Sequence, residues 1–161
     1  MRIGFGYDSH VFTDAEKPLY LGGVLIEGAQ GLKAHSDGDV VIHALIDALF
    51  GAAALGDIGG HFPDSDPQWK GADSTHLLAT AVREVAAAGF RIGNCDITVI
   101  CEKPRLSPHV LSIRERLAGL LAIPLTAVSV KGKTNEKMDD VGAGKGIEVH
   151  CVVLLNEIKP V

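Results

Sequence analysis

The sequence predicts a single globular domain over residues 1–161 that combines β-strands with α-helices. A length of 161 residues is typical of one domain with a sizeable core. Apolar residues make up 47% of the chain, which is too many for a disordered protein. Segments with a two-residue hydrophobic period occur among segments of helical period, and these two patterns predict the individual strands and helices.

Residues 2–12 are predicted to form the first strand. Their two-residue period places Asp8 and His10 side by side on one face, where they can present a carboxylate oxygen and an imidazole nitrogen to one ion. Gly4 and Gly6 precede them on that face and are expected to leave it open. Taken alone, an Asp-x-His pattern is more often an ordinary polar strand end than an ion site.

Residues 20–26 follow as a short strand pair or a bulged strand. A polar loop then leads into a helix predicted over residues 39–54, with Ser36 as its N-cap and Asp39 as the capping-box partner. His35 would lie just before this helix. Because a helix start gathers free N–H groups that suit an anion, this segment indicates a phosphate site.

Asp39, His43 and Asp47 recur every four residues and are expected to form one polar stripe on this helix, with His43 about two turns inside it. Together with Asp8 and His10, His43 completes three ligands of the kinds that zinc prefers, and a catalytic zinc keeps a fourth position open. Asp47 either orients an imidazole or belongs to a solvated face. These residues alone therefore predict a metal and phosphate site.

The middle of the chain adds a loop rich in Gly, Pro and Asp over residues 57–67. That composition is typical of turns, yet Asp57 and Asp64 could also bind the hydroxyl groups of a small substrate. Residues 74–88 are predicted to form an amphipathic helix that indicates only structure, His76 included.

A strand predicted at residues 95–101 leads into a basic loop at 102–108 and a helix at 109–121. Within the loop, Lys103 and Arg105 either meet a nucleotide or its phosphates, or belong to an ordinary charged surface turn.

A strand at residues 127–131 precedes a loop, residues 132–137, that brings together a hydroxyl, an amide, a carboxylate and lysines. Glu136 in this loop suits a hard cation such as Mg²⁺, held jointly with phosphate oxygens. Residues 141–145 are rich in glycine but lack the strand–turn–helix context of a dinucleotide site. The last strand is predicted over residues 147–157.

Composition and charge exclude several functions. The net charge of −5 argues against nonspecific nucleic-acid binding, and a single Trp argues against a base-stacking surface. The chain has no apolar run of membrane-spanning length and no signal-peptide layout, so a cytoplasmic protein without membrane contact is expected. Cys95, Cys101 and Cys151 lack metal-site spacing and are expected to be reduced thiols buried in strands.

Seven motifs occur in order along the chain: Asp8-x-His10, Ala-His-Ser-Asp-Gly-Asp at 34–39, His43, Gly-Ala-Ala-Ala-Leu-Gly-Asp-Ile-Gly at 51–59, Phe-Pro-Asp-x-Asp at 62–66, Lys-Gly-Ala-Asp-Ser at 70–74 and Thr-Asn-Glu-Lys at 134–137. In these motifs the chain resembles the 2-C-methyl-D-erythritol 2,4-cyclodiphosphate synthases. The resemblance covers essentially the whole chain, and its 34–74 portion is highly specific.

The resemblance implies an α+β fold, a four-stranded mixed β-sheet with helices packed on one face, assembled as a homotrimer with active sites between subunits. It implies a phosphorus-oxygen lyase of the non-mevalonate isoprenoid pathway. Such an enzyme converts 4-diphosphocytidyl-2-C-methyl-D-erythritol 2-phosphate into 2-C-methyl-D-erythritol 2,4-cyclodiphosphate. The 2-phosphate of the substrate attacks the β-phosphorus, and CMP leaves.

The resemblance also implies roles for individual residues. Zn²⁺, one ion per subunit, would be held by Asp8, His10 and His43, and Mg²⁺ or Mn²⁺ by Glu136. His35 and Thr134 match positions that stabilise the transition state. The residues that match contacts to the methylerythritol portion are Ser36, Asp57, Gly59 and Asp64. Further residues expected to bind substrate are Ile58, Phe62, Pro63, Ser65, Asp66 and Asn135. The residues that match the cytidine pocket, part of which the adjacent subunit supplies, are Cys101, Glu102, Lys103, Pro104, Arg105, Leu106, Ser107, Gly132, Lys133 and Thr134.

Two places depart from the family pattern. In residues 140–146, Asp140 stands where many members carry an aromatic residue, and Ala143 stands in a run that commonly holds an arginine. Those two residues are associated with an isoprenoid diphosphate on the trimer axis, so this chain lacks them for that ligand. Lys133 replaces a small hydroxyl residue and changes the contacts offered to cytidine or phosphate.

Two rival functions follow from the same residues. The first is a zinc hydrolase that uses metal-bound water, with Asp47 or Asp64 as general base. The second is a nonenzymatic module that binds a metal or a nucleotide. The full set of motifs favours the synthase over both.

Overall fold

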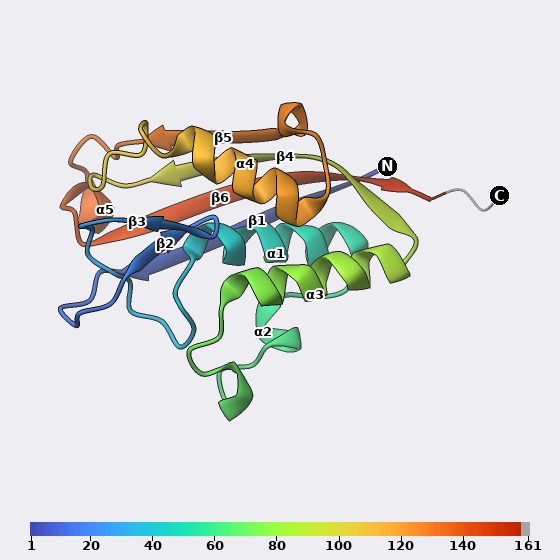
Figure 1. Cartoon of the computed structure of the whole chain (residues 1–161), viewed down its shortest axis with the longest axis horizontal. Helices are drawn as coiled ribbons and strands as arrows, with labels where there is room; N and C mark the ends of the chain where they lie inside the picture. Colours follow the sequence, from blue (N-terminus) through green and yellow to red (C-terminus); the bar gives the residue numbers. More distant parts are fainter. Residues whose placement is uncertain (159–161) are drawn as a thin grey trace.

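The computed structural model describes residues 1–158, and its centre is a four-stranded mixed sheet with helices on one face (Figure 1). The strands lie in the order β1-β6-β4-β5, with β4 and β5 parallel and the other pairs antiparallel. This arrangement confirms the α+β prediction. The strands are β1 (Arg2–Val11), β4 (Phe90–Ile100), β5 (Val128–Lys133) and β6 (Gly146–Glu157).

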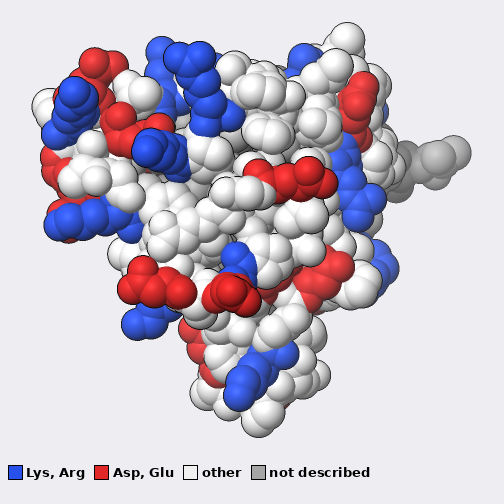
Figure 2. Space-filling model, turned by 60° about the vertical axis from the view of Figure 1, so that its left-hand side comes forward, with Lys and Arg blue, Asp and Glu red and all other residues white. Residues whose placement is uncertain are grey.

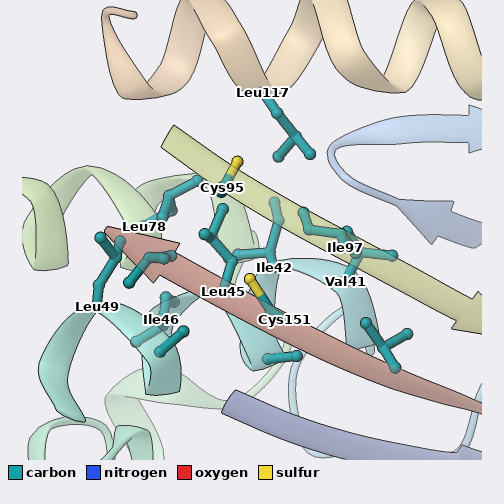
Figure 3. Close-up of a cluster of buried hydrophobic side chains, with 14 of the residues drawn as sticks. Val41, Ile42, Leu45, Ile46, Leu49, Leu78, Cys95, Ile97, Leu117 and Cys151 are labelled. Carbon is teal, nitrogen blue, oxygen red and sulfur yellow. The ribbon is translucent and has the colours of Figure 1, made fainter. Parts of the chain in front are cut away.

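Three long helices cover one face of the sheet: α1 (Val40–Ala53), α3 (Ser74–Ala87) and α4 (Val110–Leu121). Helix α1 packs on β1 and β6, α3 lies beside α1, and α4 packs on β5. The core fills the space between these layers, with side chains from α1, α3, α4, β4 and β6 meeting in Figure 3. The smaller elements are β2 (Leu19–Leu21), β3 (Val24–Ile26), α2 (Ile58–His61), η1 (Pro67–Trp69), η2 (Leu125–Ala127) and α5 (Asp139–Gly142).

Gly4 and Gly6 determine how closely α1 approaches β1. A Cβ atom on Gly6 would lie 1.9 Å from the carbonyl oxygen of Ala44, and one on Gly4 would lie 1.9 Å from that of Ala48. The prediction that these glycines leave the strand face open is therefore wrong, because the helix backbone occupies that space. The close approach brings the end of β1 against the first turn of α1.

The start of α1 also differs from the prediction. Asp39, not Ser36, is the N-cap, and its Oδ1 accepts hydrogen bonds from the backbone N–H groups of Val41 and Ile42, both at 3.1 Å. The same carboxylate accepts from the backbone N–H groups of Gly22 and Gly23, at 2.9 and 2.6 Å. Asp39 is thus fully buried rather than part of a polar stripe, and burial raises the pKa of its carboxyl.

Because α1 begins at Val40, His43 lies in its first turn rather than two turns inside it. Other boundaries also differ: β4 begins at Phe90, five residues before the predicted start, and continues through an irregularity between Ile92 and Asn94. The short helix α2 lies in the loop predicted over residues 57–67, and α5 lies in a segment for which no element was predicted.

The three cysteines are free and buried, as predicted. Cys95 and Cys151 lie on β4 and β6, while Cys101 follows the last residue of β4. Burial raises the pKa of Cys95 to about 12 and that of Cys101 to about 11, so neither thiol ionises near neutral pH. Within residues 1–158, no helix is long and apolar enough to cross a membrane.

Candidate active site

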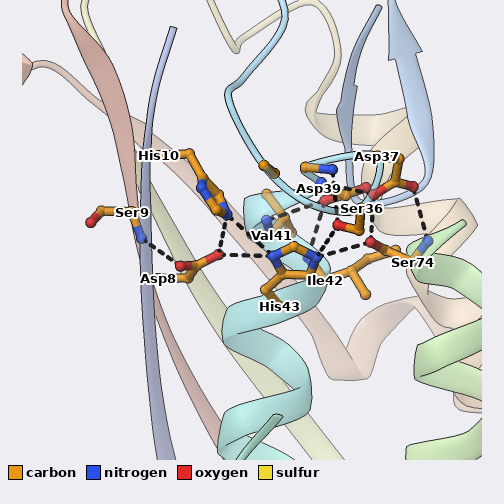
Figure 4. A network of polar contacts seen from close by, with 12 residues as sticks. Asp8, Ser9, His10, Ser36, Asp37, Asp39, Val41, Ile42, His43 and Ser74 are labelled. Atoms are coloured by element: carbon orange, nitrogen blue, oxygen red, sulfur yellow. Dashed lines mark hydrogen bonds and ion pairs between the residues drawn. The ribbon is translucent and has the colours of Figure 1, made fainter. Parts of the chain in front are cut away.

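Three side chains from two elements converge at the end of β1. Asp8 and His10 extend from one face of the strand, and His43 reaches them from the first turn of α1 (Figure 4). Asp8 Oδ2 lies 3.0 Å from both His10 Nε2 and His43 Nδ1, and the two imidazole nitrogens are 3.3 Å apart. The structure therefore brings together the three residues that the sequence singled out as metal ligands.

The electrostatics of this cluster favour a bound cation. Burial alone would raise the pKa of Asp8, but the hydrogen bonds and charge of His10 and His43 outweigh it and hold that pKa well below the usual range. Burial would lower the pKa of His43, but the Asp8 carboxylate raises it. The Asp8 carboxylate thus places negative charge next to the ring nitrogens of both His10 and His43, which favours a cation there.

The donor set also fits a metal ion. One ligand atom from each of Asp8, His10 and His43 can be chosen so that all three lie within 4.8 Å of one another. A carboxylate with two imidazoles is a ligand set that zinc accepts, and three protein ligands leave a fourth position for a substrate oxygen. These residues could therefore hold a divalent metal.

A cavity of about 350 Å³ opens beside this cluster. His35 lines it, and among the described residues no group hydrogen-bonds its buried Nε2 atom. That nitrogen is consequently a polar atom at the wall of the cavity without a partner in the described part of the chain. The predicted residues that line the cavity are Asp8, His10, His35, Ser36, His43, Ile58, Gly59, Phe62, Pro63 and Asp64.

Three predicted substrate contacts lie outside the lining of this cavity. Asp57 caps α2 by accepting from the backbone N–H of Gly60, and Asp66 caps the turn at η1. Ser65 is an exposed turn residue between them. The ordinary turn chemistry of an Asp-rich loop accounts for where the two aspartates point, and their contact with substrate stays a prediction.

Sequence reasoning missed one lining residue with a clear place in the site, Trp69, and left the role of another, Asp47, open. Trp69 packs edge-on against Phe62, with ring centres 5.1 Å apart, and extends the apolar wall of the cavity. Asp47 lines the cavity and accepts a hydrogen bond of 2.8 Å from the backbone N–H of Ile58. Asp47 thus holds the start of α2, a role different from both of those that the sequence left open.

A second cavity, of about 260 Å³, lies at the ends of β4 and β5. Thr134 lines this cavity, and its hydroxyl donates a 2.7 Å hydrogen bond to Glu136 Oε1. The backbone N–H of Asn135 donates to Glu102, while Lys103 lines a neighbouring hollow instead. The predicted residues that line this second cavity are Cys101, Glu102, Pro104, Arg105, Leu106, Ser107, Gly132, Lys133 and Thr134.

The two cavities lie at the same end of the sheet but at opposite edges. His10 pairs with Ile147 across β1 and β6, while Ile100 pairs with Glu148 across β4 and β6, so both strands end at one level. From β1 to β5 is three strand spacings, or about 14 Å. Among the described residues, none lines both cavities. Within a single chain, the two predicted halves of the site are therefore separate.

Figure 2 turns this end of the sheet toward the reader. Lys and Arg side chains gather on the upper left of that face, but acidic side chains are mixed with them and dominate below. A mixed surface of this kind suits a small charged ligand better than a long polyanion.

Comparisons with known proteins agree with this architecture. The YgbB family model matches residues 1–156. A protein of Alcanivorax borkumensis named 2-C-methyl-D-erythritol 2,4-cyclodiphosphate synthase is 56% identical over 155 residues, covering 96% of each chain.

Two solved structures are also similar. The bifunctional IspDF of Campylobacter jejuni superposes with a TM-score of 0.93 at 40% identity, over 97% of this chain and 42% of that longer protein. IspF of Plasmodium falciparum, solved as a CDP complex, gives a TM-score of 0.86 at 37% identity, over 98% of this chain and 97% of that one. With a family model matched over nearly its whole length and a relative 56% identical, the chain belongs to the YgbB family, the 2-C-methyl-D-erythritol 2,4-cyclodiphosphate synthases, which are lyases.

Proposed function

We propose that this single-domain chain converts 4-diphosphocytidyl-2-C-methyl-D-erythritol 2-phosphate into 2-C-methyl-D-erythritol 2,4-cyclodiphosphate and CMP, in the non-mevalonate isoprenoid pathway. The observation that carries the proposal is the convergence of Asp8, His10 and His43 beside a cavity, in a chain of this family. In the reaction, an oxygen of the 2-phosphate bonds to the β-phosphorus, and the bond from that phosphorus to the oxygen of CMP breaks. No water is consumed.

The half of the site at β1 would hold the methylerythritol phosphate. Asp8, His10 and His43 would bind Zn²⁺, which when bound neutralises negative charge on a phosphate oxygen. His35 lines the same cavity and would contact that phosphate; its buried Nε2 has no other hydrogen-bond partner in the described chain. The backbone of α2, held in place by Asp47, would position the methylerythritol hydroxyls against the cavity wall.

The half of the site at β4 and β5 would hold the cytidine diphosphate. Arg105 and Lys133 bring positive charge to the second cavity, where the diphosphate would lie. Glu136 would bind Mg²⁺ or Mn²⁺ together with diphosphate oxygens, and Thr134 is placed beside that carboxylate. The CDP complex of the Plasmodium falciparum relative supports a cytidine site in this family.

A homotrimer would join the two halves. Each half lies at one edge of the sheet, at the same level, so a ring of identical copies can place the β1 edge of one beside the β5 edge of the next. The sheet face opposite the helices exposes apolar side chains that such an assembly would cover, notably Phe5, which is 61% exposed, and Ile3, which is 74% exposed. The family resemblance supplies the number three.

A ³¹P NMR assay tests this function. Purified protein with Mg²⁺ is mixed with the cytidylated methylerythritol 2-phosphate, and we expect two coupled signals of a cyclic diphosphate with an equal amount of CMP. Release of inorganic phosphate would instead identify the zinc hydrolase. Binding of the substrate without any turnover would identify the nonenzymatic module.

Glu136→Gln is expected to weaken the response of turnover to added Mg²⁺ or Mn²⁺, because it removes a negatively charged ligand from the second metal. CMP release is measured against metal concentration for the variant and for Glu115→Gln, which changes an exposed acid on α4. We expect the concentration for half-maximal turnover to rise by about tenfold in the Glu136 variant alone. An unchanged titration would remove Glu136 from this role.

A further inference from the structure

We propose that Ser74 and Asp37 are positioning residues that fix the imidazole of His43 through a hydrogen-bond relay, so that its Nδ1 atom faces the metal. This inference deepens the proposed function and rests on the metal centre described there. Sequence reasoning assigned the helix that begins at Ser74 a purely structural role, and it gave Asp37 no role of its own.

The ring of His43 lies between two groups of polar atoms (Figure 4). Its Nδ1 is 3.0 Å from Asp8 Oδ2, on the side where the metal ligands converge. Its Nε2 is on the opposite side, 3.0 Å from Ser74 Oγ and 3.2 Å from Ser36 Oγ. One ring nitrogen is thus placed to hold a metal, while the other contacts the protein behind it.

The direction of each hydrogen bond follows from Asp37. A carboxylate can only accept, so the 2.5 Å contact between Ser74 Oγ and Asp37 Oδ1 uses the single hydroxyl proton of Ser74. The lone pairs of Ser74 Oγ are then left to accept from His43, which requires the proton on Nε2. With the proton held there, Nδ1 of the neutral ring presents its lone pair to the metal.

The relay is buried and tied to several elements. Ser74 is fully buried, at 0% exposure, and its backbone N–H donates to Asp37 Oδ2 at 2.9 Å. Asp37 Oδ1 also accepts from the backbone N–H of Asp39, the N-cap of α1, at 3.0 Å. Asp37 thus connects the starts of α1 and α3, and the position of the ligand ring depends on both.

Ser36 is less suited to fix the ring. Its Oγ accepts from the backbone N–H of Gly38 at 3.2 Å, but no carboxylate directs its hydroxyl proton in the described chain. The hydroxyl of Ser36 can therefore rotate to donate to Nε2 or to accept from it. Of the two hydroxyls beside Nε2, only that of Ser74 has its proton directed by a carboxylate, so the Ser74 contact is the one that fixes a proton on Nε2.

The test compares Ser74→Ala with Thr75→Val in the full chain stripped of metal. Thr75 is the next residue of α3, and its hydroxyl contacts Asp73 at 2.7 Å rather than His43, so the control removes a hydroxyl from the same helix start. The dissociation constant for Zn²⁺ is measured by competition with a chelator of known affinity. We expect it to rise about ten- to a hundredfold in Ser74→Ala and to change by less than about threefold in Thr75→Val.

A measurement on the zinc-loaded wild-type protein needs no variant and therefore does not depend on Ser74→Ala folding. Long-range ¹H–¹⁵N spectra should show the His43 proton on Nε2, exchanging slowly with water. A proton on Nδ1, an unchanged zinc affinity in Ser74→Ala, or an equal loss of affinity in Thr75→Val would each overturn the relay. A wild-type chain that binds no zinc would overturn the metal centre itself, which separates failure of the proposed function from failure of this inference.

Discussion

His43→Ala is expected to abolish stoichiometric zinc binding and to lower turnover by at least about a thousandfold. The substitution removes one of three converging ligands and leaves Asp8 and His10, which together cannot define a site of fixed geometry. Zinc content per chain, measured after gel filtration, and the rate of CMP release report the two effects separately.

His76→Ala is the matched control, because His76 is an exposed histidine on α3 outside the cavity. It should keep both zinc and activity. The His43 variant should also keep the oligomeric state of the wild type, since His43 is buried in the cavity wall and not on the exposed sheet face. Normal zinc content together with normal turnover in His43→Ala would exclude the assignment of the metal centre.

Two of the three proposed metal ligands, Asp8 and His10, were predictable as neighbours because they follow from a local period in the sequence. Alternation along β1 places Asp8 and His10 on one face, and the structure has them there. Their meeting with His43 depends on how α1 packs across β1, which the spacing of residues alone does not determine. The motif resemblance supplied that link before the fold was known.

The cap of α1 shows where local patterns lose information. Ser36 and Asp39 are both residue types that are favoured at the N-cap of a helix, so the local pattern fits either of them in that position. The choice depends on Gly22 and Gly23, whose backbone N–H groups bind the Asp39 carboxylate from the hairpin of β2 and β3. The N-cap is therefore decided by contacts between residues sixteen or seventeen positions apart in the sequence. The residues next to the helix start do not contain that information.

Ser74 and Asp57 illustrate two limits of sequence reasoning about the candidate site. Ser74 begins an amphipathic helix and carries no local sign of a role, yet its hydroxyl lies 3.0 Å from a ring nitrogen of His43. Asp57 lies in a loop whose composition invites a functional reading, yet its side chain caps α2. A side chain that contacts a metal-binding histidine can be identified only once the packing of the fold is known. Aspartates, by contrast, are common in loops because they suit the backbone geometry of turns.

The two cavities raise a question that no single chain answers. If each site combines the β1 half of one copy with the β5 half of its neighbour, then two inactive variants should complement each other. His43→Ala damages only the first half, and a chain carrying both Thr134→Ala and Glu136→Ala damages only the second. Each variant alone should be nearly inactive.

When the two variants are unfolded, mixed in equal amounts and refolded together, we expect about one quarter of the turnover of wild-type protein treated in the same way. A site is intact only when the double variant supplies its β1 half and the His43→Ala chain supplies its β5 half. In a random equal mixture each of these conditions is met in half of the sites, so both are met in about one quarter. Each variant refolded by itself, then mixed, is the control for exchange of subunits.

Recovery in the mixture would require that residues from two copies act on one substrate, because neither chain contains both undamaged halves. If each chain instead closed its own complete site, every site in the mixture would carry one damaged half, and turnover would stay at the level of the separate variants. The complementation therefore distinguishes a shared site from a self-contained one without depending on which metal is bound, and it accounts for two cavities that lie about 14 Å apart across one sheet.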